Sequence, residues 1–332
     1  MNNNHLLGPW IRRFLLEYLV GERNLARNTQ ASYRDTLTLF LPFASKCTGI
    51  AIDRMDVEDL SPAVVRQFLD YLERERNCTG VTRNQRLGTI HSLAHFIGIR
   101  SPVHLSWCTE VRLVPFKKTN KNLIGYLEKV EMDELLKQPN RESPLGFRDY
   151  VLLLFLYNSG ARADEAACLT IDHLQLASPP SVRIIGKGNK IRMCPLWPMM
   201  APLLQTLVNG RDADQVVFLG RTNKPMTRFG IHRIVTHYAQ MAGEKIPSLL
   251  TKRVSPHNIR HTTAVHMLRS GVDINTIRAW LGHVSLDTTN IYAEVDLEMK
   301  ARALASVDIS GLPAEPLRQR HLPSLMTFLR GI

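Results

Sequence analysis

The residues best suited to chemistry lie in the second half of the chain, in four short polar clusters. Two arginines, one lysine, two histidines and one tyrosine follow one another there, in the order Arg162, Lys187, His257, Arg260, His283, Tyr292. Arginine and lysine bind anionic oxygens, histidine and lysine transfer protons, and a tyrosine phenol can act as a nucleophile. His257 and Arg260 are three residues apart, which places them on one face of a helix.

Taken one at a time, these residues also have ordinary structural interpretations. Arg162 is compatible with an ion pair to a nearby acid such as Asp164 or Glu165, and Tyr292 with a place in a core or on a surface. Lys187 lies in the turn Gly186-Lys187-Gly188-Asn189, where a lysine is normally only solvated. A functional assignment therefore depends on the combination of these residues and on their spacing, and not on any one of them.

A metal centre is one alternative chemistry. His257 and His261 are four residues apart, as are the histidines of the zinc-protease motif H-E-x-x-H. Asn258 occupies the position of the catalytic glutamate in that motif, which argues against a metalloprotease. The five cysteines are widely spread and form no C-x-x-C pair, which argues against a thiolate zinc site and a disulfide framework. We expect no metal, no cofactor and a reduced, cytoplasmic setting.

Composition narrows the class of partner. The chain has 332 residues, with 42 Lys and Arg against 30 Asp and Glu, for a net charge of +12. Such an excess favours a polyanionic partner, and nucleic acid is the first candidate for a cytoplasmic protein. No apolar run reaches the about 18 residues that span a bilayer, and the N-terminus lacks the pattern of a secretion signal. Membrane and exported proteins are therefore excluded.

The elements that must position the polar clusters fall into two predicted domains, since the chain is about twice the size of a common domain. Residues 1–100 read as a small helical domain. Residues 101–123 break the helical pattern and contain a lysine cluster, so we expect a basic linker. Residues 124–310 form the second domain, and residues 311–332 a tail with a short apolar face at its end.

Apolar spacing and capping residues locate individual helices and strands. Trp10, Phe14 and Tyr18 recur every four residues, and Ser61-Pro62 has the form of a helix start. In the second domain the apolar segment 150–157 is expected to be buried on all sides. The remaining predicted elements there are two strands, 182–185 and 191–196, and helices over 130–136, 228–241, 256–268 and 273–281.

With their neighbours, the six polar residues resemble the tyrosine recombinase (phage integrase) family. The similarity extends to the segments G-A-R-A-D-E-A, I-I-G-K-G-N-K, H-N-I-R-H-T-T-A and L-G-H-V-S-L-D-T-T-N-I-Y. The gaps of 3, 23 and 9 residues from His257 to Tyr292 are like those of Xer-type members. Many members have T-G-L-R where this chain has Ser159-Gly160-Ala161-Arg162, a change that we expect to alter packing and leave the chemistry intact.

The resemblance implies a mainly α fold with a small β-hairpin or sheet. An N-terminal SAM-like helical core-binding domain would precede a C-terminal mixed α+β catalytic domain. It also implies a site-specific DNA recombinase of the integrase or transposase type, which cuts and rejoins strands through a 3′-phosphotyrosine at Tyr292 and a Holliday junction. The motifs are shared by recombinases of phages, transposons, integrons and chromosome-dimer resolution.

The chemistry of a phosphodiester explains these residue types. Arg162 and Arg260 can each donate two parallel hydrogen bonds to the non-bridging oxygens, whose charge grows during attack. The family assigns protonation of the departing 5′-oxygen to the residue that matches Lys187. The phosphotyrosyl bond conserves the energy of the broken bond, so rejoining needs neither ATP nor a metal.

The remaining site residues have supporting roles under the same resemblance. His257 would accept the proton of Tyr292, and His283 would hydrogen-bond the phosphate. Glu165 would orient the segment that carries Arg162. Basic and polar residues at helix starts and in the linker are candidate DNA contacts, although each also fits a solvated surface: Arg83, Arg86, Lys117, Lys118, Lys121, Thr227, Arg228, His232 and Arg233.

The partners implied are double-stranded recombination sites and further subunits in a tetramer on DNA, which are copies of this chain or sister recombinases. The tail 311–332 either folds back on its own domain or docks on a neighbouring subunit. Two other functions stay open. One is an accessory DNA-binding protein that no longer exchanges strands, and the other is a nicking-closing enzyme of topoisomerase or telomere-resolvase type. Ordered strand exchange between two sites separates the recombinase from both.

Overall fold

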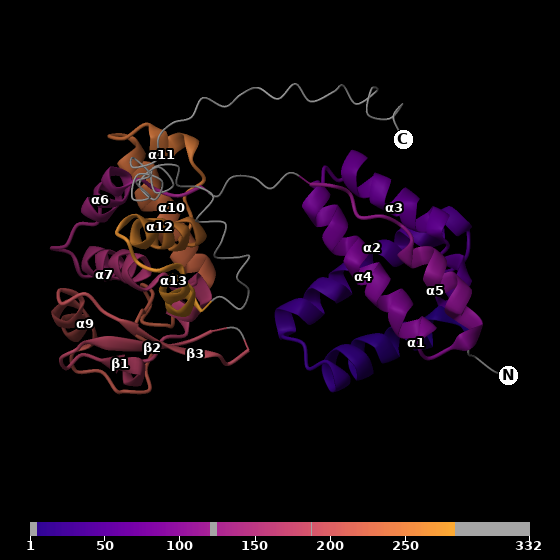
Figure 1. The fold of residues 1–332 in the computed structure, drawn as a ribbon, viewed down its shortest axis with the longest axis horizontal. Helices are drawn as coiled ribbons and strands as arrows, with labels where there is room; N and C mark the ends of the chain where they lie inside the picture. The colour runs from indigo at the N-terminus through magenta and orange to yellow at the C-terminus, as the bar shows by residue number, and fades with distance from the viewer. Residues whose placement is uncertain (1–4, 120–124, 187, 283–332) are drawn as a thin grey trace, which may run out of the picture. The chain divides into compact units, whose positions relative to one another are not determined.

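The computed structural model describes residues 5–119, 125–186 and 188–282. The chain divides into two compact units, Met1–Asn122 and Leu123–Ile332, and each has a hydrophobic core of its own. Figure 1 shows the first unit as helices alone and the second as helices around a small sheet. The predicted fold class, mainly α with one small sheet, is confirmed. No helix in the described ranges is long and apolar enough to cross a membrane.

The first unit is a bundle of helices joined by short 3-10 turns. Ser61 caps its third α-helix by accepting a hydrogen bond from the backbone N–H of Val64, and Pro62 opens the first turn, as the sequence predicted. Its elements are α1 (Leu7–Arg13), the π-helix η2 (Phe14–Glu22), α2 (Arg27–Thr48), η3 (Ile52–Arg54), η4 (Val57–Asp59), α3 (Pro62–Arg74), α4 (Gly80–Gly98), η5 (Pro102–His104) and α5 (Leu105–Arg112).

Aromatic side chains fill the core of this unit. Phe14 and Phe96 lie with their ring centroids 5.5 Å apart, and Phe40 and Phe68 with theirs 4.8 Å apart. All four are completely buried. Burying a phenylalanine side chain stabilises a fold by about 1.5–3 kcal/mol, so each of these rings makes a substantial favourable contribution to the bundle.

Residues 101–114, which the sequence analysis assigned to the linker, belong to the first unit in the structure. They form η5 and α5, whose side chains Trp107, Cys108 and Val111 are buried in the aromatic core. Trp107 also donates a hydrogen bond from Nε1 to the carbonyl oxygen of Leu60 (3.0 Å). These three residues are spaced as one face of a short helix. The prolines and lysines of the segment concealed that pattern.

Residues 115–119, here called the docked strap, lie along the start of α4. Asn84 binds the strap twice. Its Nδ2 donates to the carbonyl oxygen of Lys117 (2.7 Å), and its Oδ1 accepts from the backbone N–H of Lys117 (2.9 Å). Arg83 donates to the carbonyl oxygen of Pro115 (3.0 Å), and the ammonium of Lys117 pairs with Glu73 (2.8 Å). The basic segment is therefore fixed to the first unit by its backbone.

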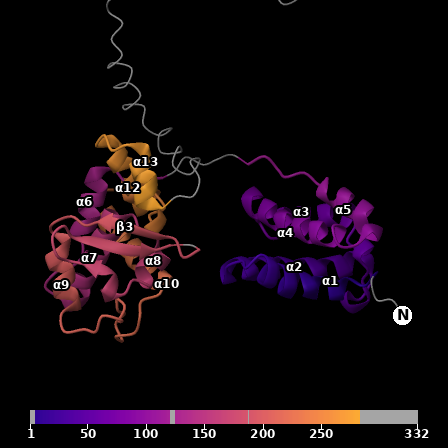
Figure 2. The same ribbon diagram turned by 60° about the horizontal axis from the view of Figure 1, so that its bottom comes forward.

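The second unit packs its helices against one face of a small sheet, and the residues on the other face of the sheet are exposed. Figures 1 and 2 both show α12 and α13 side by side, and α9 at the far end of the unit beside the sheet. The elements are α6 (Lys129–Lys137), α7 (Pro144–Ser159), α8 (Ala163–Ala167), η6 (Ile171–His173), β1 (Leu174–Gln175), β2 (Ser181–Ile185), β3 (Ile191–Pro195), α9 (Met200–Val208), α10 (Arg228–Gly243), α11 (Ser248–Thr251), α12 (Pro256–Arg269) and α13 (Ile274–Leu281).

The sheet is antiparallel with the order β1-β2-β3. The predicted hairpin is confirmed, with Val182 opposite Cys194 and Ile184 opposite Arg192. Val182, Ile184 and Cys194 are buried, so one face of the hairpin covers the core of the unit. β1 was not predicted, because two residues are too few to display an alternating pattern.

α7 forms the centre of the second unit. It is buried without a break from Arg148 to Ser159, as the apolar segment 150–157 predicted. α12 packs across it, and Thr263 on α12 donates a hydrogen bond to the carbonyl oxygen of Tyr157 (2.7 Å). α12 itself begins where the sequence predicted, with Ser255 accepting from the backbone N–H of Asn258 (3.3 Å). The crossing of α7 and α12 positions the functional site.

Candidate functional site

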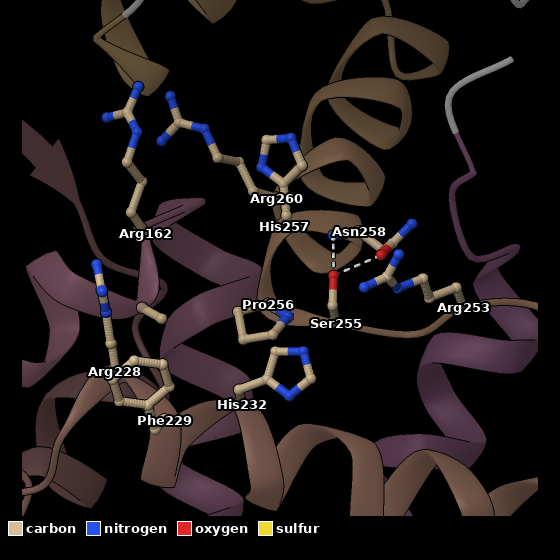
Figure 3. Close-up of a pocket in the computed structure, with 11 residues that line it drawn as sticks. Arg162, Arg228, Phe229, His232, Arg253, Ser255, Pro256, His257, Asn258 and Arg260 are labelled. Atoms are coloured by element: carbon tan, nitrogen blue, oxygen red, sulfur yellow. Dashed lines mark hydrogen bonds between the residues drawn. The ribbon is translucent and has the colours of Figure 1, made fainter. Parts of the chain in front are cut away.

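A pocket of about 560 Å³ opens where α10 and the starts of α8 and α12 meet. Three residues singled out in the sequence, Arg162, His257 and Arg260, line it together, and Figure 3 shows them reaching into the same part of it. The described lining includes four arginines and no carboxylate, so the pocket attracts anions. The full lining is Arg162, Ala163, Arg228, Phe229, His232, Arg253, Ser255, Pro256, His257, Asn258 and Arg260.

Arg260 is held rigidly at the back of this pocket. The residue is only 2% exposed, and its two terminal nitrogens donate to the carbonyl oxygens of Gly160 (2.7 Å) and Leu281 (2.5 Å). Both carbonyls lie at helix ends, where they have no partner within the helix. Because a buried guanidinium must be hydrogen-bonded, these two acceptors set the plane of the group.

The helix end at Gly160 depends on glycine. The residue caps α7 in the left-handed conformation, with φ of +59°. A Cβ atom there would lie 2.5 Å from Cδ2 of Leu281, closer than any side chain can approach. Glycine therefore allows the ends of α7 and α13 to meet around Arg260.

Arg162 is presented to the pocket by a capping box. It is the N-cap residue of α8, and its backbone N–H donates to Oε2 of Glu165 (2.9 Å) while its Nη1 donates to Oε1 (2.7 Å). The Arg162 side chain is 40% exposed, whereas the Glu165 side chain is 5% exposed. Arg162 is thus both a structural ion-pair partner and a pocket residue, which joins the two interpretations left open by the sequence.

The carboxylate of Glu165 is shared with a second arginine that the sequence analysis missed. Arg192 on β3 donates from Nη1 to Oε1 (3.2 Å) and from Nη2 to Oε2 (2.7 Å). Each carboxylate oxygen therefore accepts two hydrogen bonds. Burial alone would raise the pKa of Glu165, but the hydrogen bonds and charge of Arg192, together with the hydrogen bonds from Arg162, lower the pKa below its usual range. Glu165 is consequently ionised at neutral pH.

His257 is exposed at the mouth of the pocket, one turn before His261 on α12. The two rings contact each other with centroids 4.1 Å apart. Desolvation by the surrounding protein lowers the pKa of His257, and the positive charges of Arg260 and Arg162 lower it further. The imidazole is therefore neutral at neutral pH and is able to accept a proton. Among the described residues, no group of three or more metal-ligating side chains occurs.

The candidate DNA contacts of the second unit lie at the start of α10. Arg228 and His232 line the pocket, with Arg228 placed 4.8 Å from the ring of Phe229. Arg233 is exposed and does not line it. The hydroxyl of Thr227 accepts a hydrogen bond from the backbone N–H of Gly230 (3.1 Å), so its structural role is to cap the helix.

The candidate DNA contacts of the first unit differ in their exposure and in their partners. Arg83 and Arg86 are half-buried on α4, and Arg83 holds the docked strap. Lys117 is paired with Glu73, whereas Lys118 is exposed. Lys121 lies outside the described residues.

Three predicted catalytic residues, Lys187, His283 and Tyr292, also lie outside the described residues, as does the tail 311–332. The chain that directly precedes two of them is defined. A Cβ atom on Gly186 would lie 3.0 Å from Oε1 of Glu165, and one on Gly282 would lie 3.2 Å from Cδ of Arg192. The backbone just before Lys187 and just before His283 therefore lies against the Glu165–Arg192 pair.

Arg253 and Phe229 are further pocket residues that the sequence did not single out. Phe229 is 71% exposed, so a large apolar ring faces solvent among the arginines that line the pocket. Helical periodicity could have placed it on the outer face of α10. Its neighbourhood depends on how α10 packs against α8 and α12, and local sequence does not specify that.

Comparison with known proteins identifies the class to which this fold and site belong. Residues 125–299 match the phage integrase family, and residues 11–98 match the phage integrase N-terminal SAM-like domain. A putative integrase/recombinase, y4rC, of Sinorhizobium fredii (strain NBRC 101917 / NGR234) is 32% identical over 334 residues, covering 100% of both chains. The tyrosine recombinase XerD of Haemophilus influenzae is 33% identical over 298 residues, covering 87% of this chain and 94% of its own length.

Solved structures agree in fold. The XerH site-specific recombinase in its pre-cleavage complex with difH substrate has a TM-score of 0.64 at 20% identity, covering 86% of this chain and 81% of that one. The Tn1549 transposon integrase in complex with transposon right end DNA has a TM-score of 0.66 at 13% identity, covering 89% and 98%. Fold and site together define a tyrosine recombinase with two domains. The chain belongs to the phage integrase family, which confirms the resemblance seen in the sequence.

Proposed function

We propose that this recombinase cuts and rejoins specific double-stranded DNA sites in the cytoplasm through Tyr292, in a pocket built around Arg162, His257 and Arg260. The observation that carries this proposal is the convergence of these three residues, from the start of α8 and from α12, on one anion-attracting pocket. Arg162 and Arg260 bind the scissile phosphate through its non-bridging oxygens. Arg228 and the other residues at the start of α10 approach the DNA beside it.

Cleavage forms one bond and breaks another at the same phosphorus atom. The phenolic oxygen of Tyr292 attacks phosphorus and forms the 3′-phosphotyrosyl bond, while the bond to the 5′-oxygen breaks. The tyrosine proton passes to the neutral imidazole of His257, and Lys187 gives a proton to the departing 5′-oxygen. Charge that grows on the non-bridging oxygens is stabilised by Arg162, Arg260 and His283. Losing one such donor costs about 10²–10³ in rate.

Rejoining runs the same steps in reverse with a 5′-hydroxyl from the partner duplex, so no external energy source is consumed. Two successive exchanges pass through a Holliday junction. We infer a tetramer on DNA, made of this chain alone or with sister recombinases, in which the tail 311–332 docks on a neighbouring subunit. Truncation after Gly311 should then weaken assembly on DNA in sedimentation experiments, and unchanged assembly would remove the tail from this role.

The deciding experiment is covalent trapping on nicked duplexes taken from DNA that flanks the gene. A nick next to the cleavage position makes the fragment with the new 5′-hydroxyl so short that it diffuses away. The protein then stays bound to the 3′-phosphate of the remaining strand, because rejoining is no longer possible. We expect a covalent adduct with the native chain and none with Tyr292→Phe, which should still bind the duplex. An adduct of equal yield with Tyr292→Phe would place the nucleophile elsewhere.

The same experiment separates the rival functions. Binding without any adduct supports an accessory DNA-binding protein. An adduct with relaxation of supercoiled DNA, but without exchange between two sites, supports a nicking-closing enzyme. Exchange between two sites on one plasmid supports the recombinase.

A further inference from the structure

Arg192 does not line the pocket, and its ion pair with Glu165 does not fully explain why an arginine stands at this position. Its side chain is 8% exposed, and within the part of the chain that the structure describes its buried Nε has no hydrogen-bond partner. A buried donor without an acceptor costs stability, and a buried ion pair is often no more stable than apolar residues of the same size. Stability alone therefore does not account for an arginine here.

The strand register gives Arg192 its orientation. Arg192 stands opposite Ile184, which is buried, whereas Arg183 on β2 stands opposite Met193, which is exposed. Arg192 consequently shares the inner face of the hairpin, and Arg183 lies on the outer face with 44% of its side chain exposed. Arg183 is therefore an exposed arginine on the same hairpin as the buried Arg192, and it can serve as a matched control.

Arg192 contacts the base of the turn that leads to Lys187. A Cβ atom on Gly186 would lie 3.0 Å from Oε1 of Glu165 and 3.5 Å from Nη1 of Arg192, so the backbone at Gly186 is seated directly on the ion pair. The turn is closed behind it by a hydrogen bond from the backbone N–H of Gly186 to the carbonyl oxygen of Lys190 (2.8 Å). Lys187 follows Gly186 in the chain.

The same ion pair fixes the phosphate-binding arginine. Glu165 holds both the backbone and the guanidinium of Arg162, as described above. One carboxylate–guanidinium unit therefore supports Arg162 on one side and the base of the turn on the other. A displacement of about 1 Å in a catalytic group can cost about 10²-fold in rate, so such a common support is valuable.

We propose that Arg192 is a positioning residue for strand cleavage, which acts through Glu165 and Gly186 to hold the β2–β3 turn, and with it the general acid Lys187, in register with Arg162. This inference rests on the proposed function. The reaction step that Arg192 would support is the protonation of the leaving 5′-oxygen of the scissile phosphodiester. Arg192 itself does not touch the reacting atoms.

The test compares two trapping duplexes that differ in one atom. One has the normal 5′-oxygen at the scissile phosphate, and the other has sulfur in that bridging position. A thiolate leaves without being protonated, so loss of the general acid matters much less on the sulfur duplex. Lys187→Ala should lose about 10²–10⁴ in the rate of adduct formation on oxygen DNA and far less on sulfur DNA.

For Arg192→Met we expect the same signature in weaker form. Adduct formation should slow about 10–10²-fold on the oxygen duplex and return to within a few-fold of the native rate on the sulfur duplex. Arg183→Met, on the outer face of the same hairpin, should keep the native rate on both. Arg192→Lys keeps a positive charge but cannot donate to both carboxylate oxygens, so it should show an intermediate loss that sulfur also rescues.

Several outcomes would overturn the inference. One such outcome is an equal loss of rate on both duplexes for Arg192→Met, while sulfur still rescues Lys187→Ala. Arg192 would then act only by positioning Arg162 or by stabilising the fold. A native rate for Arg192→Met on oxygen DNA would remove any role. If the Met variant is unfolded by circular dichroism, Arg192→Lys decides by the same comparison. A Lys187→Ala loss that sulfur does not rescue would overturn the general acid of the proposed function and this inference together.

Discussion

The carboxylate of Glu165 lies 2.7 Å from Nη1 of Arg162, and the same carboxylate accepts the backbone N–H of Arg162 at 2.9 Å. The side chain of Arg162 and the backbone that carries it are therefore fixed by one acid three residues further along. Since Glu165 is buried and ionised, it links the geometry of the pocket to the stability of the second unit.

Replacing Glu165 by glutamine should destabilise the second unit in a pH-dependent way. The amide keeps the shape but leaves Arg192 buried without an anionic partner, which costs about 3–5 kcal/mol in the free energy of unfolding at pH 7. The pKa of Glu165 is lowered in the folded state. Its stabilisation is thus present above the unfolded pKa of about 4.3 and is lost as pH falls through the lower folded pKa.

Denaturant unfolding at pH 7 and at about pH 3 measures this difference. The gap between the native chain and Glu165→Gln should shrink at the lower pH. Asp164→Asn is the matched control, because Asp164 is an exposed neighbour on α8. A gap of equal size at both pH values would mean that the charge of Glu165 is not what stabilises the unit.

Titration of His257 should make the rate of cleavage fall at acidic pH, which gives the pH–rate profile an acidic limb. The pKa of its imidazole is lowered by desolvation and by the charges of Arg260 and Arg162. The neutral base is therefore present at pH 7 and is lost only as pH falls below the ordinary histidine value of about 6.5. Single-turnover adduct formation at limiting protein concentration, followed from pH 5 to 8, should fall at the acidic end.

His257→Gln removes the titrating group and should flatten that limb while lowering the plateau by about 10²–10⁴. His232→Gln controls for a second histidine that lines the pocket, and its profile should keep the acidic limb. An acidic limb that persists in His257→Gln would assign the proton acceptor to another group.

Replacement by lysine should affect the stability of the fold differently at Arg162 and at Arg260. Arg162→Lys and Arg260→Lys each lose paired hydrogen bonding to phosphate, and we expect both to slow adduct formation by about 10²–10³. Arg260→Lys should also destabilise the fold, because the carbonyls of Gly160 and Leu281 lose their donors at a buried position. Thermal unfolding of both variants beside the adduct assay checks this, and equal melting temperatures would contradict the anchoring role of Arg260.

At the start of α10 we expect Thr227 to be a structural residue and Arg228 to be a DNA contact. Thr227→Ala removes a helix cap and should lower the free energy of unfolding by about 1 kcal/mol without changing the salt dependence of DNA binding. Arg228→Ala should reduce the slope of log affinity against log salt by about 1. Thr227→Ser keeps the cap and serves as the control. A changed salt slope in Thr227→Ala would restore the threonine as a contact.

The sequence was a good guide wherever a local pattern carried the information. Ser61 followed by Pro62 marked the start of α3, and the predicted ranges 256–268 and 273–281 agree with α12 and α13 to within one residue at each end. The convergence of Arg162, His257 and Arg260 followed from their positions in the family motifs. Arg192 could not be found in this way. It alternates along a strand as Arg183 does, and only the register with the neighbouring strand decides which arginine is buried.

The end of the first unit is a second place where local sequence did not reveal the structure. Prolines and lysines dominate the composition of residues 101–123, but three side chains of α5 reach the aromatic core. Tertiary packing overrode the compositional signal there. In the pocket, Phe229 and Arg253 depend on contacts between elements far apart in the chain, so no local rule could have placed them beside Arg162.

Two asparagines anchor the backbone, one in each unit, on either side of the boundary between the units. Asn84 holds the carbonyl of Lys117 and Asn258 holds the carbonyl of Gly125 (2.9 Å), so eight residue steps separate the two anchored points. Because Asn258 directly follows His257 in the chain, its hydrogen bond to Gly125 joins the start of the second unit to the first turn of α12, the helix that carries His257 and Arg260.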